Sequence, residues 1–203
     1  MPPMATSLTA TGVVWSSLSL ASAILNCAGF YLPLWIRGQL PDGTEVTFGS
    51  FRRCNYPRFS ETGKLDMVHE CGRYTTFADI PSLSWQISTI TVGLGASVSL
   101  LVTFTSLAAC CVSDVITKYT ARVLGVVQLM AALLMGVGCS IYPNGWSSPE
   151  VKDACGNQSD AYRLGTCEVN WSIYLMSTGI AFLLFCSVLS LKASRIKPNS
   201  YRI

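Results

Sequence analysis

The sequence predicts an all-α membrane protein, a bundle of four transmembrane helices that carries a small, disulfide-stapled β-sheet on its extracellular side. Only 12% of the 203 residues are charged, against about 25% in an ordinary soluble domain. Four stretches hold no Asp, Glu, Lys or Arg, namely 2–36, 80–113, 123–149 and 169–191. Four cysteines lie in the two polar segments between those stretches. Together these features predict one tetraspan domain over residues 1–203.

Each uncharged stretch can hold the roughly 20 apolar residues that cross a bilayer core of about 30 Å. Backbone N–H and C=O groups find no water in hydrocarbon, so these stretches are expected to be helices. We place the four spans at about 12–36, 86–112, 121–142 and 170–191. The polar loops between them then cover about 37–85 and 143–169.

The first stretch also has a signal-peptide interpretation, because Ala21-Ser22-Ala23 resembles a cleavage site. No Lys or Arg precedes it, however, and the apolar run continues about a dozen residues beyond Ala23. A signal h-region is only about 7–15 residues long. A first membrane span is therefore the favoured expectation.

The first polar loop is predicted to form strands. Residues 34–40 and 44–48 are rich in β-prone side chains, and Pro41-Asp42-Gly43 between them has turn chemistry. Two further strands are expected over 48–54 and 71–77. The stretches around Gly145 and Cys167 are expected to complete this layer on the bundle.

The cysteines of the two loops are predicted to form disulfides. Their spacings are 17 residues in the first loop and 12 in the second, and His69 is the single histidine. Zinc sites need three or four ligands with closely spaced pairs, and redox centres use C-x-x-C. Four cysteines permit three pairings. The favoured pairs lie within the loops, Cys54–Cys71 and Cys155–Cys167.

The cysteines indicate which side of the membrane the loops face more clearly than the basic residues do. The terminal side carries six Lys and Arg and the loop side eight, which decides nothing. Disulfides belong to oxidising compartments, and Asn157-Gln158-Ser159 is a glycosylation sequon. We therefore expect a multi-pass protein of the plasma membrane or an endomembrane, with both termini cytoplasmic and a glycan on Asn157. A second sequon at Asn170 abuts a span and is expected to stay unmodified.

The spans hold few polar groups beyond Ser and Thr. Asn26 and Gln128 are expected to bond across the first and third spans as interhelical contacts. Transport is disfavoured, because ionisable residues that line a pathway are absent from the four uncharged stretches. Small residues recur four apart and either seal the bundle or face a partner helix. Six aromatic residues are expected to form a belt at the lipid headgroups: Trp35, Trp85, Tyr142, Trp146, Trp171 and Tyr174.

Two features near the cytoplasmic side have open interpretations. Cys110 and Cys111 follow the second span and are either palmitoylated or packed as free thiols. The tail Ser200-Tyr201-Arg202-Ile203 fits a PDZ domain, which adds such a terminus to a sheet edge. No catalytic constellation, cofactor motif, metal site or nucleic-acid module is predicted.

Several motifs resemble the lipoma HMGIC fusion partner family of tetraspan proteins, which groups with the claudin and peripheral myelin protein superfamily. The resemblance runs from about Ala5 to Ser190. It is carried by FGSFRRC at 48–54, ECGRY at 70–74, CCVSD at 110–114, YPNGW at 142–146, ACG at 154–156 and LGTCE at 164–168.

The resemblance implies a left-handed, claudin-like bundle under an extracellular sheet. Phe51 stands where claudins have a second tryptophan, and the cysteine pair of the second loop is not a claudin feature. Some family members act as auxiliary subunits of channels or receptors, so that is the expected function. Cell-junction or adhesion work through the loops, as in claudins, is the alternative.

Overall fold

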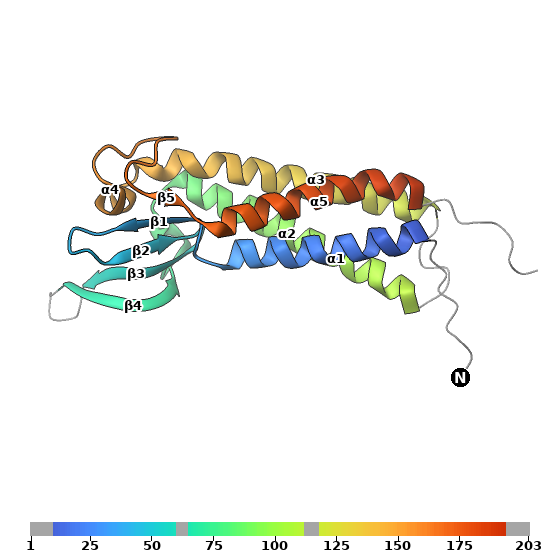
Figure 1. Cartoon of the computed structure of the whole chain (residues 1–203), viewed down its shortest axis with the longest axis horizontal. Coiled ribbons are helices and arrows are strands. Elements are labelled where there is room, and N and C mark those ends of the chain that lie inside the picture. Colours follow the sequence, from blue (N-terminus) through green and yellow to red (C-terminus); the bar gives the residue numbers. More distant parts are fainter. Residues whose placement is uncertain (1–9, 60–64, 112–117, 194–203) are drawn as a thin grey trace, which may run out of the picture.

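The computed structural model describes residues 10–59, 65–111 and 118–193, and residues 58–59, 65–66, 109–111, 118 and 193 by their backbone alone. The described chain forms a long helical bundle with a small folded layer at one end (Figure 1). We call the described residues of 34–80 and 142–170 the cap.

The bundle consists of four helices that are long and apolar enough to cross a membrane. They are α1 (Ala10–Tyr31), α2 (Leu83–Cys111), α3 (Lys118–Ile141) and α5 (Trp171–Ala193). At 1.5 Å per residue, the shortest of them is about 33 Å long, which matches the hydrocarbon core. The tetraspan prediction is thereby confirmed.

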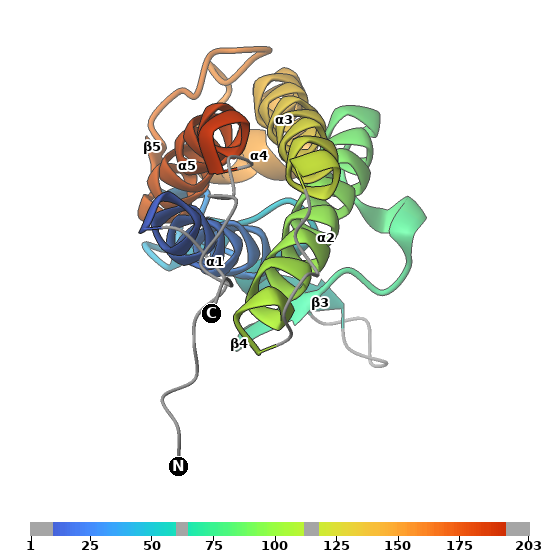
Figure 2. The ribbon, with the colours of Figure 1, turned by 90° about the vertical axis from the view of Figure 1, so that its right-hand side faces the viewer.

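The helices form a closed ring. In the end-on view of Figure 2, α1 packs against α2 and α5, and α3 packs against the same two helices. The start of α1 and the end of α5 lie at the end of the bundle away from the cap (Figure 1). Both polar loops therefore fold on one end, as the four-span arrangement requires.

The cap holds a five-stranded antiparallel sheet in the order β4-β3-β2-β1-β5. Its strands are β1 (Ile36–Gln39), β2 (Glu45–Phe48), β3 (Arg52–Phe59), β4 (Leu65–Arg73) and β5 (Glu168–Val169). The β1–β2 hairpin turns at the predicted Pro41-Asp42-Gly43, where Gly43 adopts φ +83°. β5 pairs with β1, so the sheet joins the two loops across the chain.

Several predicted bounds are wrong. The first helix ends at Tyr31 instead of residue 36, because Pro33 has no N–H and disfavours a helical residue before it. The strand predicted at 71–77 ends at Arg73 and begins as early as Leu65. Residues 74–76 are irregular, and a short 3-10 helix, η1 (Phe77–Asp79), begins at the last residue of the predicted strand. The second loop contains two helical segments that we did not predict, η2 (Tyr142–Ser147) and α4 (Pro149–Cys155).

The predicted aromatic belt is wrong for three residues, because Trp35, Trp85 and Tyr142 are completely buried where the cap meets the bundle. The Trp85 and Tyr142 rings stack with centroids 4.7 Å apart, and Trp35 meets Tyr142 edge-on at 4.7 Å. Each indole N–H donates to a backbone carbonyl, Trp35 to Gly29 (2.7 Å) and Trp85 to Tyr142 (3.0 Å). Both tryptophan side chains can be buried because each indole N–H has a hydrogen-bond acceptor.

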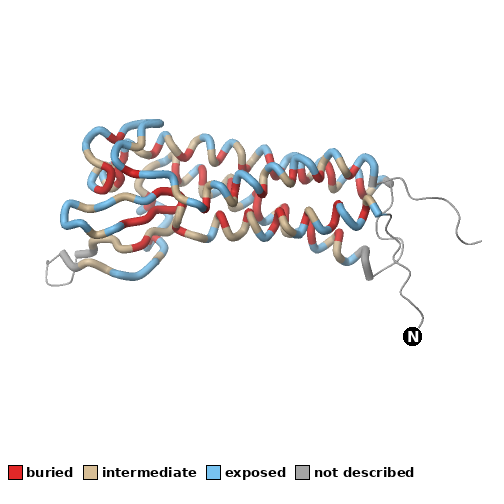
Figure 3. The backbone as a smooth tube through the Cα atoms, viewed as in Figure 1, coloured by how far each residue is buried: buried red, intermediate tan, exposed pale blue. Residues whose placement is uncertain are grey.

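The aromatic residues exposed at this level include Trp171 and Tyr174 of the predicted belt and three others. Each spanning helix has at least one at or beside its cap end: Tyr31 for α1, Phe77 for α2, Tyr162 for α3, and Trp171 and Tyr174 for α5. The tube in Figure 3 shows the contrast between the buried junction and the exposed outer faces of the helices. These exposed rings fit the headgroup level of a bilayer.

Candidate functional site

Two disulfides staple the cap, with the pairing that the spacing favoured. Cys54 and Cys71 lie directly opposite each other on β3 and β4, with Cα atoms 4.0 Å apart. Cys155, the last residue of α4, is bonded to Cys167 just before β5, with Cα atoms 4.9 Å apart. The second staple also packs on the first loop, since a Cβ on Gly38 of β1 would lie 2.3 Å from the Cys167 sulfur.

A partly buried polar cluster, which we call the clasp, links the two loops through Arg53 on β3, Tyr74 after β4 and Glu150 on α4. The Arg53 guanidinium donates a hydrogen bond to Glu150 within an ion pair, and the Tyr74 hydroxyl lies 3.3 Å from the other Glu150 oxygen. The same guanidinium lies over the rings of Tyr56 (4.1 Å) and Tyr74 (4.6 Å). Three-quarters of both charged side chains are shielded from solvent.

Sequence reasoning missed the clasp. Its ionic partners are 97 residues apart, and no local pattern pairs residues at that distance. The start of α4 was detectable, because Ser148-Pro149-Glu150 combines an N-cap residue, a proline in the first turn and an early acidic residue.

The pH dependence of the clasp has a defined sign. Burial raises the pKa of the Glu150 carboxyl above its ordinary value of 4.5, against the opposing effect of Arg53. The folded state therefore holds this proton to a higher pH than the unfolded chain does. The stability that Glu150 contributes is fully present below the ordinary pKa and is lost as the pH rises through the folded pKa.

Mild acidification is therefore expected to leave the cap intact or to stabilise it slightly. The measurement is the unfolding midpoint of detergent-solubilised protein between about pH 5 and pH 8, for the unmodified chain and for Glu150→Gln. The glutamine variant should lose the part of the pH dependence that comes from this group. A drop on acidification that Glu150→Gln abolishes would contradict the assignment.

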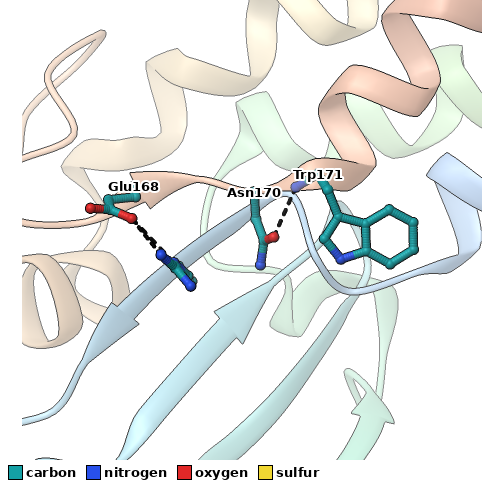
Figure 4. Close-up of polar contacts among 4 residues, drawn as sticks. Glu168, Asn170 and Trp171 are labelled. Atoms are coloured by element: carbon teal, nitrogen blue, oxygen red, sulfur yellow. Dashed lines mark hydrogen bonds and ion pairs between the residues drawn. The ribbon is translucent and has the colours of Figure 1, made fainter.

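A second ion pair joins the loops at the surface. Arg37 on β1 donates to Glu168 on β5 at 2.7 Å, and both side chains are more than half exposed. Exposed pairs of this kind contribute about 0–1 kcal/mol. Next to it, the Asn170 side chain accepts a hydrogen bond from the Trp171 backbone N–H at the start of α5 (2.8 Å; Figure 4). This region fixes where the last span begins.

Polar side chains inside the spans close the bundle, and the predicted bond between the first and third spans is confirmed for Gln128. Gln128 of α3 accepts from Trp15 Nε1 (3.0 Å) and donates to Ser19 Oγ (2.7 Å), which links α3 to α1. Asn26 bonds within α1 instead. It donates to Ser22, whose hydroxyl donates to the Gly179 carbonyl of α5. Gln128 and Asn26 have no exposed surface, so they act as contacts between helices.

Most of the small residues that recur four apart pack against neighbouring helices of the bundle. A Cβ on Gly95 would lie 2.5 Å from Met135 of α3, and one on Gly179 would lie 2.2 Å from Asn26. Gly136 of α3 differs, because a Cβ there would meet no atom within 4 Å. A small residue at Gly136 is therefore not required by the packing of this chain.

Gly136 lies in a groove of about 400 Å³ on the outer side of α3 and α5, which we call the outer groove. The residues that line the outer groove are mostly apolar, and several of them are exposed. The groove therefore opens outward, away from the interior of the bundle. The Tyr162 hydroxyl closes the cap end by donating to the Ser140 carbonyl (2.9 Å). The lining residues are Ala132, Leu133, Gly136, Val137, Ser140, Ile141, Tyr162, Ile180 and Leu184.

The remaining predicted sites have different outcomes. Asn157 is exposed on the cap surface. The side chains of Cys110 and Cys111 and the whole tail 200–203 lie outside the described residues. His69 is exposed on β4. Within the described ranges no three His, Cys, Asp or Glu residues gather as metal ligands.

Comparison with known proteins assigns the family. The family model described as "Lipoma HMGIC fusion partner-like protein" matches residues 11–195. Three curated relatives are similar over most of their length. LHFPL tetraspan subfamily member 3 proteins of Xenopus laevis and Homo sapiens are 32% and 31% identical, covering 89% of this chain and 79% and 73% of the relatives.

The member 2a protein of Danio rerio is 29% identical over 92% of this chain and 88% of its own length. The match therefore extends through all four spans and both stapled loops. On this basis the chain belongs to the lipoma HMGIC fusion partner-like (LHFPL) family of tetraspan membrane proteins.

Proposed function

We propose that this protein is a non-enzymatic auxiliary or assembly subunit that binds another integral membrane protein, such as a channel or receptor, through the outer groove. The observation that carries this proposal is the open space at Gly136. A small residue that the bundle itself does not need lets a foreign helix approach the backbone of α3 closely. The neighbouring α5 face adds two exposed small residues, Ser177 and Ala181.

The chemistry of the outer groove suits a helix partner. Helices associate in lipid by van der Waals packing and hydrogen bonds, because lipid tails are as apolar as the side chains. The Ser140 hydroxyl beside Gly136 donates to the Gly136 carbonyl (2.8 Å), which satisfies it within α3. A partner helix can therefore pack here without leaving an unpaired polar group.

The proposed orientation places the cap outside the cell or in the lumen, with both termini cytoplasmic. Two disulfides in the cap support this, because thiols stay reduced in the cytosol. The last described residues of α2 and the first of α3 lie at the far end of the bundle, with the start of α1 and the end of α5 (Figure 1). Both the plasma membrane and an endomembrane satisfy this arrangement.

The test is affinity capture from native membranes in mild detergent, followed by crosslinking and mass spectrometry. Gly136→Leu should reduce capture of an integral membrane partner at least tenfold, since its side chain occupies the outer groove and a Cβ at this position meets no neighbouring atom within 4 Å. The matched control is Ser97→Leu, which enlarges a small residue on the exposed face of α2, outside the outer groove. It should leave capture unchanged.

Recovery of only this chain and lipid from the unmodified protein would overturn the proposal. An equal loss of capture with both leucine variants would also count against it, because the outer groove would then have no special part. Enrichment at cell contacts only when both cells express the protein would instead favour the claudin-like junction function.

A further inference from the structure

We propose that Asn157 carries an N-linked glycan whose first sugars lie in a groove between the two loops of the cap, and that this glycan is added before the second loop folds. The inference depends on the proposed lumenal orientation of the cap and not on the proposed membrane partner. It starts from a pocket of about 580 Å³, which we call the loop groove.

The loop groove is built from both loops. The β1–β2 turn, β3, β4, and α4 with the residues after it contribute its walls, and Asn157 is one of the lining residues. Because Asn157 is exposed, a chain attached to its side-chain nitrogen can extend without displacing protein. The other lining residues are Leu40, Pro41, Asp42, Pro57, Met67, Lys152, Asp153 and Gly156.

The lining suits a carbohydrate. Sugar rings present C–H faces that pack on apolar side chains, and Leu40, Pro57 and Met67 supply such a surface. Sugar hydroxyls donate and accept hydrogen bonds, and Lys152 and Asp153 provide one donor and one acceptor beside Asn157. A glycan seated here contacts both loops and shields the apolar residues from water.

The timing follows from Ser159, the hydroxyl residue of the sequon. The sequon requires Ser or Thr at this position, so the transferring enzyme must reach the hydroxyl. In the folded cap Ser159 is 1% exposed, and its hydroxyl donates to the Trp146 carbonyl (2.8 Å). The Cys155–Cys167 disulfide closes the segment that contains it. The folded loop therefore hides the group that the enzyme must recognise.

The transfer itself uses a polyisoprenoid diphosphate-linked oligosaccharide. The bond between the anomeric carbon and the diphosphate oxygen breaks, and a bond forms between that carbon and Asn157 Nδ2. The amide nitrogen loses one proton to water, and the lipid diphosphate departs with the bonding electron pair. No oxidant or reductant is required, so the step needs only an accessible sequon on the lumenal side.

The second sequon provides an internal comparison. The Asn170 side chain accepts from the Trp171 N–H, and its backbone N–H donates to the Trp35 carbonyl (2.8 Å). Ser172 is completely buried in the first turn of α5. Burial does not separate the two sequons, because Ser159 is buried as well. Asn170 lies at the membrane end of the cap, where α5 begins, and this position next to the bilayer predicts a single glycan, on Asn157.

The first test compares electrophoretic mobility before and after peptide-N-glycosidase treatment of protein from animal cells. The unmodified chain, Asn170→Gln and Ser159→Thr should each show one glycan. Asn157→Gln and Ser159→Ala should show none. Absence of the glycan from a chain whose cap is lumenal by protease protection would overturn this inference and leave the proposed function standing.

The second test addresses the timing. Folded, unglycosylated chain made with the lipid-linked donor blocked is offered that donor and the transferase in detergent. The native chain should remain unmodified, while the same chain after reduction and unfolding should accept the glycan. Transfer to the native chain at a comparable rate would overturn the proposed order of events.

The third test addresses the seating of the sugars. Trimming by an endoglycosidase leaves one sugar on Asn157, and this protein should unfold about 3 °C above Asn157→Gln, a shift that a few new contacts produce in a chain of this length. Equal midpoints would exclude a glycan packed in the loop groove. Trimming of Asn170→Gln serves as the control and should match the trimmed unmodified chain.

Discussion

Trp85→Ala is expected to lower the free energy of unfolding by about 3–5 kcal/mol, the range for removing a buried tryptophan. Trp85 has no exposed surface, stacks on Tyr142 and donates its indole N–H to the Tyr142 carbonyl. It also meets Phe48 of β2, with ring centroids 5.9 Å apart. Its loss leaves a cavity where the sheet, α2 and η2 meet, so the cap should loosen from the bundle.

The measurement is the unfolding midpoint in detergent, followed by size-exclusion chromatography of heated samples. For a chain of this length 1 kcal/mol corresponds to about 2–4 °C, so a fall of roughly 10 °C is expected. Trp171→Ala is the matched control, because that ring is 47% exposed at the start of α5. A similar fall for both variants would show that the buried junction is not the main support of the cap.

Removal of the second staple is expected to have the next largest effect. The double variant Cys155→Ala/Cys167→Ala opens a loop with a separation of 12 residues, which corresponds to about 3 kcal/mol in the chain-entropy model. α4 should become mobile, since Cys155 is its last residue and is completely buried. The clasp should weaken with it, because Glu150 lies on the same helix.

The midpoint under non-reducing conditions tests this prediction. Cys139→Ala is the control, since Cys139 is a free, partly buried cysteine of α3 and closes no loop. It should shift the midpoint far less than the double variant does. If reduction of the unmodified chain lowered its midpoint no more than reduction of the double variant, the staple would have no stabilising part.

The sequence predicts the bundle well because the distribution of charged and apolar residues indicates which segments cross the membrane. The same distribution does not indicate whether an aromatic side chain at the end of a span faces the headgroups or the protein interior. Sequence alone therefore predicts a headgroup belt for Trp35, Trp85 and Tyr142, whereas the structure buries all three. Aromatic residues suit both environments, and only the packing of the sheet on the bundle distinguishes them.

The candidate interaction surfaces depend on contacts that are distant in sequence. Spacing indicated that small residues serve close helix approach, but it could not separate Gly95, which packs on Met135, from Gly136, which packs on nothing. The disulfide pairs were predictable because each joins cysteines of one loop. The clasp joins two loops, and its pairing depends on the fold that brings Glu150 of α4 to Arg53 of β3.

The proposed topology requires the cap and the chain ends to lie on opposite sides of the membrane. The direct measurement is protease protection in sealed microsomes, with one epitope inserted after Gly43 in the exposed β1–β2 turn and another at the C-terminus. We predict that the Gly43 epitope survives until detergent opens the vesicles, while the terminal epitope is digested at once. Digestion of the Gly43 epitope in sealed vesicles, with the terminal epitope protected, would contradict the account.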